Sequence, residues 1–346
     1  MVSPSRPEDE PCREVDLPVT VVTNPLTIAP HLHLGKAGVR LDDGPRSYFF
    51  GGSGIAASAE TARTVAVAEV YERVLAHPAL HRERAAPFAL RGVLSGGVVG
   101  SAHPNEVLFQ GKHAVDATPD ELRRDERRAP RTNGLAYYPE LGGAVRHGML
   151  EVLERHLACR AWYEPGTALV RIGEATPLPD GYVLERYTIE RAPALPFAVS
   201  VVGHAARPAF FCGTALRERL DEAVEKADRE ALGALDGWFA GPQAATPNPV
   251  TSARFARLVG DSAAVLRELW NAKVRPGADP LDAREVSASL AELCAELCPS
   301  PDAARYAILW RTPHGWAVRA MASGLLEKRA MREAAERSGF PSDPFV

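Results

Sequence analysis

The chain has 346 residues, of which 46% are hydrophobic and 24% charged, with a net charge of −4 and an isoelectric point near 6.2. This composition is typical of a folded globular protein with a large core, and the lack of a basic excess argues against bulk nucleic-acid binding. No run of about 18 apolar residues occurs, so no membrane span is predicted.

The N-terminal half is predicted to alternate strands with two long helices. Residues 1–17 are polar, acidic and proline-containing, which predicts a disordered lead-in without the apolar core of a signal peptide, and hence a cytoplasmic protein. The elements that follow are strands and turns over 18–60, a helix over 59–78, strands with glycine-rich turns over 88–113, a charged loop or short helix over 115–131, and a helix over 140–160.

The C-terminal half continues the alternation. It is predicted to contain strands at 181–203 and 209–212, a helix at 217–235, a loop at 237–252, helices near 253–270 and 283–297, strands at 305–311 and 315–321, and a last helix at 325–338. Because no linker interrupts this pattern, the prediction is one domain over 18–346 of α/β class, with mixed α+β character.

The cysteines and histidines give weak signals for a metal. The five cysteines are odd in number and scattered, which indicates reduced thiols. Cys294 and Cys298 are four residues apart, and core packing on a helix is favoured over a metal site because no second pair accompanies them. His31 and His33 would share one side of a strand, but no third ligand is evident.

The pattern E-x-x-E-R occurs twice, each time inside an apolar helical stretch. Its members are Glu69, Glu72 and Arg73 in the first helix, and Glu151, Glu154 and Arg155 in the second. Glutamates three apart share a helix face and repel each other, and burying them without a cation costs several kcal/mol. Surface salt bridging is the plain alternative to a metal site for either copy alone. The two copies also suggest a weak internal repeat in which the two helices correspond.

All-oxygen ligands indicate Mg²⁺ or Mn²⁺, and Mg²⁺ commonly works with phosphate oxygens. A di-iron bundle would require E-x-x-H on two helices, which is absent. No GxxxxGK[ST] sequence occurs, so a phosphate site here would not be a P-loop. The residues therefore predict a nucleoside-triphosphate site built from glutamates, Mg²⁺ and arginines.

Four segments resemble blocks of the YcaO family. GGSGIAASAETARTVAVAEVYERV (51–74) resembles the first block, and RTNGLAYYPELGGAVRHGMLEVLERHLACRAW (131–162) resembles the second. GTALRERLDEAVEKADREAL (213–232) resembles a third helix that contains Glu230, and GWAVRAMASGLLE (315–327) resembles a strand that carries a nucleotide-binding arginine. The resemblance runs in order over residues 24–327, and it implies a YcaO-like domain with paired helices beside an ATP cleft.

The resemblance implies an enzyme that uses ATP and Mg²⁺ to phosphorylate a peptide-bond oxygen of a ribosomally made precursor peptide. A side-chain thiol or hydroxyl then gives an azoline, sulfide a thioamide, or an amine an amidine. Carried over position by position, Glu69, Glu72, Glu151 and Glu154 would hold Mg²⁺ and the triphosphate. The other implied nucleotide-binding residues are Thr27, Asn133, Arg155 and Arg319.

Three departures bear on the reaction. Ile55 stands where many members of the family have lysine, Tyr138 and Pro139 replace a polar pair, and the tail GFPSDPFV is a faint version of a proline-rich end. The chain leaves no room for a fused leader-binding domain, so a partner protein could supply one; a homodimer is also open. The alternatives are a degenerate binding or scaffold subunit and an unrelated metal-dependent hydrolase.

Overall fold

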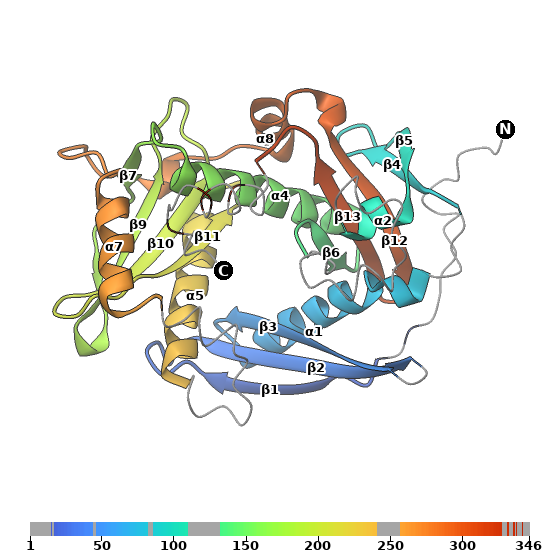
Figure 1. Cartoon of the computed structure of the whole chain (residues 1–346), viewed down its shortest axis with the longest axis horizontal. Coiled ribbons are helices and arrows are strands. Elements are labelled where there is room, and N and C mark those ends of the chain that lie inside the picture. The colour runs from blue at the N-terminus through green and yellow to red at the C-terminus, as the bar shows by residue number, and fades with distance from the viewer. Residues whose placement is uncertain are drawn as a thin grey trace.

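The computed structural model describes residues 15, 17–43, 46–81, 86–109, 132–240 and 257–326, together with 331, 335, 337 and 341. This part of the chain combines helices with antiparallel sheets, which confirms the predicted mixed α+β class. Three sheets lie around helix α4 (Leu141–Tyr163), which runs from the second sheet to the third (Figure 1).

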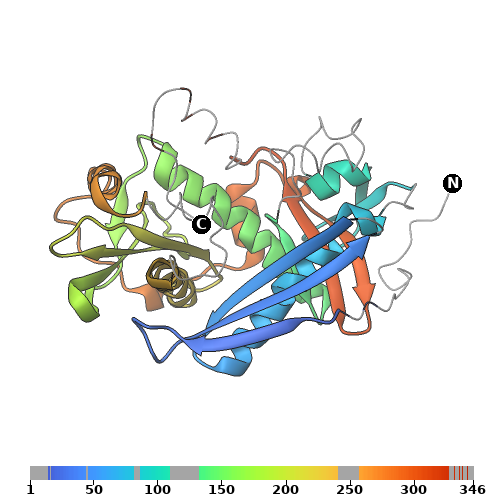
Figure 2. The ribbon, with the colours of Figure 1, turned by 60° about the horizontal axis from the view of Figure 1, so that its bottom comes forward.

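The first sheet is a meander of long strands in the order β1-β2-β3, with every pairing antiparallel. Its strands are β1 (Thr20–Pro25), β2 (His33–Asp43) and β3 (Arg46–Ala56). Helix α1 (Ala59–Leu75) lies against it, as Figure 2 shows with the three blue strands in front. The backbones of β3 and α1 approach closely. A Cβ added to Gly52 would lie only 2.3 Å from the carbonyl oxygen of Ala66, so the position requires glycine.

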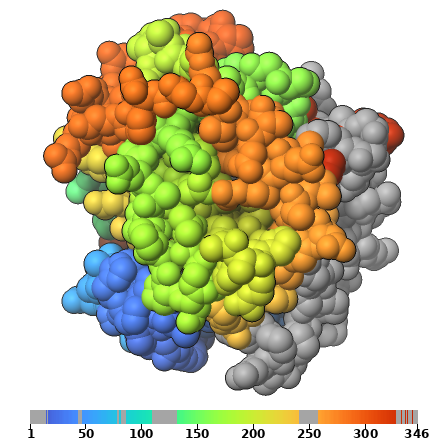
Figure 3. Space-filling model, turned by 90° about the vertical axis from the view of Figure 1, so that its left-hand side faces the viewer, coloured from blue at the N-terminus to red at the C-terminus, as the bar shows by residue number. Residues whose placement is uncertain are grey.

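The second sheet has the order β11-β10-β9-β7, with β8 paired to β9. Its strands are β7 (Leu169–Arg171), β8 (Thr176–Pro177), β9 (Tyr182–Ile189), β10 (Phe197–His204) and β11 (Phe211–Leu216). The helices that follow β11 in the chain are α5 (Leu220–Ala240), α7 (Gly260–Asn271) and α8 (Leu290–Leu297). From the side drawn in Figure 3, yellow-green residues from the middle of the chain and orange residues from its later part form one face above the blue N-terminal residues.

The third sheet joins distant parts of the chain in the order β5-β4-β12-β13-β6. Its strands are β4 (Phe88–Gly92), β5 (Val98–Ala102), β6 (Leu135–Tyr138), β12 (Ala304–Thr312) and β13 (Gly315–Ala322). The short helix α2 is Pro104–Phe109, and 3₁₀ turns cover Pro78–His81, Pro179–Gly181, Ala283–Glu285 and Pro301–Ala303. Pairing of β6 with β13 places Leu135 opposite Arg319.

Helix α4 is the central element of the main core. Its residues Met149, Leu153 and Trp162 are buried in a cluster that includes Phe210 and Trp270. A helix buried on most of its sides is apolar all round, which explains why so many of its turns carry Ala, Val or Leu. The glutamates of α4 are exceptions to that composition and therefore need partners.

One supersecondary unit occurs twice. Three antiparallel strands followed by a helix form β1-β2-β3-α1, and the same arrangement recurs in β9-β10-β11-α5. In each copy a glycine of the last strand touches the helix: a Cβ on Gly52 or on Gly213 would lie 2.3 Å from a helical carbonyl oxygen. The structural counterpart of α1 is thus α5, and the sequence-based pairing of α1 with α4 was wrong.

Most predicted elements match the structure, and three differences stand out. The helix predicted over 283–297 begins only at Leu290, because Ser289 caps it and residues 283–285 form a separate 3₁₀ turn. Residues 104–109 form α2 rather than a strand, because Pro104 suits a first helical turn and the Glu106 carboxylate accepts the amide of His103 at 3.0 Å. Helix α5 continues to Ala240, into the predicted loop 237–252. Cys294 and Cys298 are both buried in the main core.

Some predictions fall largely or wholly outside the described residues. They are the lead-in 1–17, the charged segment 115–131, most of the loop 237–252, most of the helix 325–338 and the C-terminal tail. At the edge of the lead-in, Val15 and Leu17 pack with the first sheet and α1. None of the helices in the described part is both long and apolar enough to cross a bilayer.

Candidate functional site

Edge strands of all three sheets face the helices that carry the glutamates. β3, β11 and β6 are each at the edge of a sheet, so their outward amides need acceptors other than a neighbouring strand. Helical glutamates supply those acceptors: Ser53 N–H donates to Glu69 at 2.5 Å, Thr214 N–H to Glu230 at 3.4 Å, and Tyr137 N–H to Glu72 at 3.1 Å. The glutamates are therefore oriented by the backbone.

Glu69 is paired within its own unit. Arg73, one turn later on α1, forms a salt bridge with the Glu69 carboxylate, and the same guanidinium donates to the carbonyl oxygen of Gly51 at 2.7 Å. The sequence placed Arg73 beside the pair without a role. In the structure it neutralises Glu69 and ties α1 to β3.

Among the described residues, no basic side chain forms an ion pair with Glu72, and Arg73 acts on it only weakly. Burial raises the pKa of Glu72 well above its usual value, and the charge of Glu151 raises it further. The Tyr137 amide opposes the rise, and Glu69 and Arg73 have smaller effects of opposite sign. Glu72 and Glu151 come from two different helices and repel each other across the gap between them. A cation between these carboxylates would remove that cost.

Glu151 has a similar environment. Gly134 N–H donates to its carboxylate at 3.1 Å, and Arg155 lies 3.9 Å away, too far for a short hydrogen-bonded pair. Burial raises the pKa of Glu151 above its usual value; Glu154 adds to the rise, while Arg155 and Lys226 oppose it. Glu72 and Glu151 are thus the two predicted ligands whose ionised forms are disfavoured.

Glu154 is different, because its charge is already balanced. Its side chain is 0% exposed, accepts the Thr214 hydroxyl at 2.9 Å and lies 3.1 Å from the ammonium of Lys226. Arg155 is 3.7 Å from its other oxygen. Although burial favours the neutral acid, Lys226, Arg155 and Arg217 hold the pKa of Glu154 below its usual value.

Sequence reasoning did not single out Lys226. The usable signal was Lys226 four residues before Glu230 on an amphipathic helix, a spacing that ion-pairs across one turn. The structure places its ammonium 3.1 Å from Glu230 as well as 3.1 Å from Glu154. Burial alone would lower the pKa of Lys226, but Glu154 and Glu230 raise it, so the lysine is charged.

The other predicted nucleotide contacts engage the backbone. Arg319 is fully buried, and its guanidinium donates to the carbonyl oxygens of Asn133 at 2.6 Å and Leu108 at 3.3 Å. Asn133 is thereby fixed one residue before Gly134, whose amide holds Glu151. Thr27 is exposed, and its amide donates to Asp236 of α5 at 2.6 Å.

The departures from the resemblance are also located. Ile55 lies against α5, where its Cδ1 would be 2.1 Å from a Cβ on Gly233. Tyr138 is 47% exposed and stacks on His147, with ring centroids 6.3 Å apart. Desolvation by the surrounding side chains lowers the pKa of His147 to about 4, and the charges of Arg217 and Lys226 contribute to the decrease. His147 is therefore neutral at physiological pH, and its lowered pKa makes it a weak base.

The four glutamates are not gathered around one point. Among the described residues, no group of three or more His, Cys, Asp or Glu side chains is arranged as a ligand set for a metal ion. Each glutamate instead has a separate backbone or side-chain partner, as given above. What the site offers is an acidic side, at Glu72 and Glu151, next to a cationic side, at Arg155, Lys226 and Arg217.

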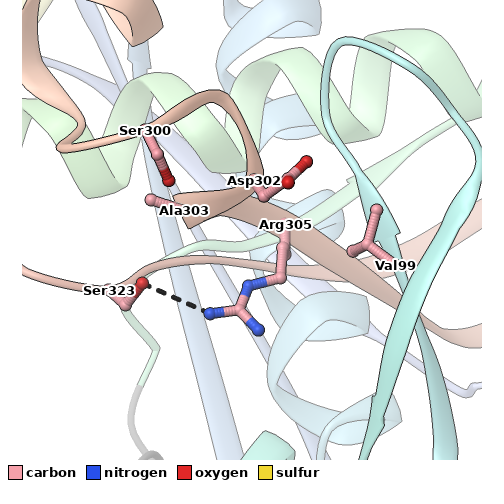
Figure 4. Close-up of a pocket in the computed structure, with 6 residues that line it drawn as sticks. All are labelled: Val99, Ser300, Asp302, Ala303, Arg305 and Ser323. Carbon is pink, nitrogen blue, oxygen red and sulfur yellow. Dashed lines mark hydrogen bonds between the residues drawn. The ribbon is translucent and has the colours of Figure 1, made fainter.

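A separate shallow hollow of about 230 Å³ lies at the start of β12 and beside β5 (Figure 4). Its lining consists of Val99, Ser300, Asp302, Ala303, Arg305 and Ser323. Arg305 donates to the Ser323 hydroxyl at 3.2 Å across it, as the dashed line marks. None of the predicted site residues lines this hollow.

Comparisons with known proteins identify the fold. No protein-family model and no curated protein matches the sequence. Among solved structures, YcaO from Methanopyrus kandleri bound with AMPPCP and Mg²⁺ matches with a TM-score of 0.59 and 15% identity, over 91% of this chain and 87% of that one.

Two further structures are similar. A heterocyclase in complex with substrate and cofactor matches with a TM-score of 0.62 and 13% identity, over 95% of this chain and 53% of that one. A chain of the E. coli microcin synthetase McbBCD complex with pro-MccB17 bound matches with a TM-score of 0.54 and 12% identity, over 87% of this chain and 86% of that one. The chain therefore has the YcaO fold, as the resemblance predicted, and it spans about half the length of the heterocyclase.

Proposed function

We propose that this chain is an ATP- and Mg²⁺-dependent enzyme that phosphorylates a backbone amide oxygen of a ribosomally made peptide, so that a nucleophile can replace that oxygen. The observation that carries the proposal is the pair of carboxylates Glu72 and Glu151. They come from two helices, and burial raises the pKa of both. The charge of Glu151 adds to the rise for Glu72, and three cations lie on the adjoining side. The YcaO fold supports the same assignment.

The donor set is compatible with Mg²⁺. Carboxylate oxygens are the ligands that this ion prefers, and it usually completes its coordination with water and phosphate oxygens. Glu72 and Glu151 would be its main ligands. The resemblance implies Glu69 and Glu154 as further ligands, and both are ion-paired in this structure. When bound, the ion would neutralise charge that develops on the transferring phosphoryl group.

The chain's own cations would hold the triphosphate. Arg155 and Lys226 lie beside Glu154, and Arg217 acts on the same carboxylate. A guanidinium can bind a phosphate through two parallel hydrogen bonds, whereas an ammonium acts as a point charge. Arg319 would act indirectly, because it fixes the Asn133–Gly134 backbone that positions Glu151. A direct contact between Arg319 and phosphate remains a prediction.

The proposed reaction has two steps that balance. The amide oxygen attacks the γ-phosphorus of ATP, and ADP leaves. A nucleophile then adds to the former carbonyl carbon and loses its proton. The amide nitrogen loses its own proton as the C=N bond forms, and inorganic phosphate departs with the amide oxygen. Phosphorylation is needed because an amide oxygen is otherwise a very poor leaving group, and a nucleophile on the same peptide gains from proximity. The product would be an azoline if the nucleophile is a thiol or hydroxyl, or an amidine if it is an amine.

The partners proposed are a precursor peptide and a second protein that binds its leader. The heterocyclase structure is much longer than the region it shares with this chain, and the microcin synthetase is a complex. Both fit a catalytic unit that receives its peptide with help from another domain or protein.

A heavy-oxygen experiment tests the reaction. A candidate precursor peptide labelled with ¹⁸O at the reacting amide is incubated with the protein, ATP and Mg²⁺. We expect one labelled phosphate for each modified residue. Phosphate that takes oxygen only from solvent, while the peptide is still modified, would contradict the mechanism.

A non-catalytic binding subunit is the second candidate, and one observation favours it. Glu69 and Glu154 are already ion-paired with Arg73 and Lys226, which leaves fewer carboxylates ready for a metal. Calorimetric titration with AMPPCP and Mg²⁺ separates the two candidates. An enzyme should bind the metal–nucleotide pair, and a scaffold subunit should bind neither.

A further inference from the structure

The ammonium of Lys226 lies between two helices and pairs with a carboxylate from each. It is 3.1 Å from a carboxylate oxygen of Glu154 on α4 and 3.1 Å from one of Glu230 on α5. The same residue of β11, Thr214, donates its hydroxyl to Glu154 at 2.9 Å and its amide to Glu230 at 3.4 Å. Carboxylates from two helices therefore flank one ammonium, and one strand residue holds both carboxylates in place.

The repeated unit shows that a cation bridging to another helix occurs in one of the two copies. Glu69 and Glu230 are equivalent, because each accepts an amide 16 residues earlier on the adjoining edge strand. Both have a basic residue one turn away, but on opposite sides: Arg73 follows Glu69, and Lys226 precedes Glu230. Arg73 turns back to its own strand, at Gly51, whereas Lys226 reaches across to another helix.

We propose that Lys226 is a built-in cation of the nucleotide site, which replaces a divalent ion between Glu154 and Glu230 and presents its ammonium to the phosphates. This inference rests on the proposed function for its ligand. Glu154, fully buried, fixes the position of the ammonium, and the remaining 22% exposure of the lysine side chain leaves it a face toward solvent. Arg155 and Arg217 add positive charge on the same side, so an anion is favoured there.

A purely structural role for Lys226 makes different predictions. If the lysine serves only to neutralise Glu154, its removal should lower stability and leave the affinity for nucleotide unchanged in folded protein. If it also contacts phosphate, affinity falls in protein that is folded. If it stands in for a metal, the space that the side chain leaves between the carboxylates of Glu154 and Glu230 should become a site for a hard cation.

The test uses the variants Lys226→Ala, Lys226→Arg and, as a matched control, Lys273→Ala. Lys273 is a partly buried lysine whose ammonium donates to the carbonyl oxygen of Glu164, and it belongs to no part of the site. Bound Mn²⁺ is first counted by electron paramagnetic resonance in the absence of nucleotide. We expect Lys226→Ala to bind one more Mn²⁺ per chain than wild type, and the other two variants to match wild type.

Affinity for AMPPCP is then measured at low and high Mn²⁺. We expect Lys226→Ala to bind about tenfold more weakly at low Mn²⁺, as for loss of one charge-assisted contact, and to recover at high Mn²⁺. Lys226→Arg should lose less. An unchanged Mn²⁺ count in folded Lys226→Ala would overturn the proposal, as would unchanged affinity for AMPPCP.

Two further results need to be interpreted: a Lys226→Ala variant that does not fold, and a wild-type protein that binds no nucleotide. If Lys226→Ala is not folded, Lys226→Gln takes its place; it should show the loss of affinity, but its amide blocks the extra ion. If wild-type protein binds no AMPPCP with Mg²⁺ at all, the proposed function fails. The Mn²⁺ count without nucleotide then still decides whether Lys226 occupies a cation site.

Discussion

The four glutamates of the two E-x-x-E-R segments differ in how their charge is stabilised, despite identical spacing. Glu69 and Glu154 are ion-paired, whereas Glu72 and Glu151 have raised pKa values. Spacing on a helix indicates only that two carboxylates share a face. Which of them receives a cation depends on residues brought in from other elements, such as Lys226 of α5.

Neutralising Glu72 should stabilise the metal-free protein. Its pKa is raised in the folded state, so the folded protein binds this proton more tightly than the unfolded chain does. Stability from this group is therefore full below about pH 4.5 and is lost as the pH rises through the raised value. At pH 8 without divalent ions, Glu72→Gln should melt higher, by about 2–4 °C for each kcal/mol of relief.

Thermal midpoints between pH 4 and 8 check this prediction. The exposed Glu268→Gln serves as the control and should track wild type at every pH. Addition of Mg²⁺ with AMPPCP should raise the midpoint of wild type but not that of Glu72→Gln. If Glu72→Gln melted below wild type at pH 8, the ionised Glu72 carboxylate would not be destabilising, and the prediction would be wrong.

Neutralising Glu154 should have the opposite effect. Its pKa is lowered by Lys226 and the arginines despite burial, so its ionised form contributes stability above its ordinary pKa, and this is lost as the pH falls. Breaking a buried ion pair costs about 3–5 kcal/mol, and the remaining contact of Lys226 with Glu230 favours the lower end. Urea unfolding at pH 7 measures the loss for Glu154→Gln, and a gain in stability would contradict the assigned pairing.

At the scale of elements, glycines set the distance between edge strand and helix. A Cβ on Gly213 would lie 2.3 Å from the carbonyl oxygen of Ala227 and 2.5 Å from the Cβ of Glu230. Gly213→Ala should therefore push α5 away from β11, at a cost of about 1–3 kcal/mol, and weaken AMPPCP binding because Lys226 moves with the helix. Gly100→Ala is the matched strand control, since a Cβ there meets nothing within 4 Å.

The measurement pairs denaturant unfolding with a nucleotide titration. Gly100→Ala should be close to wild type in both. Equal stability of Gly213→Ala and wild type would mean that the strand and helix separate without cost, and that the close approach has no role in placing the site.

Element types were largely predictable because local patterns determine them. Short apolar runs in β12 and β13 and the Ala/Val periodicity of α1 are visible in the sequence, as is the stop at Pro78. Strands β7 and β8, of three and two residues, carry too little pattern to be seen. The short helix α2 was missed although Pro104 and Glu106 stand at typical first-turn positions.

The site was predictable only in part, because its composition depends on tertiary pairing. The residues of each E-x-x-E-R segment were found from spacing and from resemblance. Lys226 and Thr214 were not, since their role follows from α5 and β11 lying next to α4. The burial of Arg319 against two carbonyl oxygens likewise depends on the pairing of β13 with β6 across most of the chain.

At the scale of the whole molecule, the site joins three sheets that are otherwise separate. Edge strands β3, β6 and β11 each present an amide to a glutamate of α1 or α5, and Gly134, beside β6, presents one to α4. Repulsion between Glu72 on α1 and Glu151 on α4 acts against close approach of these helices. A ligand that supplies positive charge to the glutamates and negative charge to Lys226 would pull all three helices together.

Binding of AMPPCP with Mg²⁺ should therefore slow hydrogen exchange at all three edges at once. The amides of Ser53, Tyr137 and Thr214 report on β3, β6 and β11, because each is held by a carboxylate rather than by a neighbouring strand. Local opening at such edges requires only that carboxylate to move away, and a ligand that fixes the carboxylate suppresses the opening. The outer strand β5, whose residues are mostly exposed, is the internal reference and should not change. Protection limited to one edge would mean that the ligand contacts one helix only, and the view of a site shared by α1, α4 and α5 would be wrong.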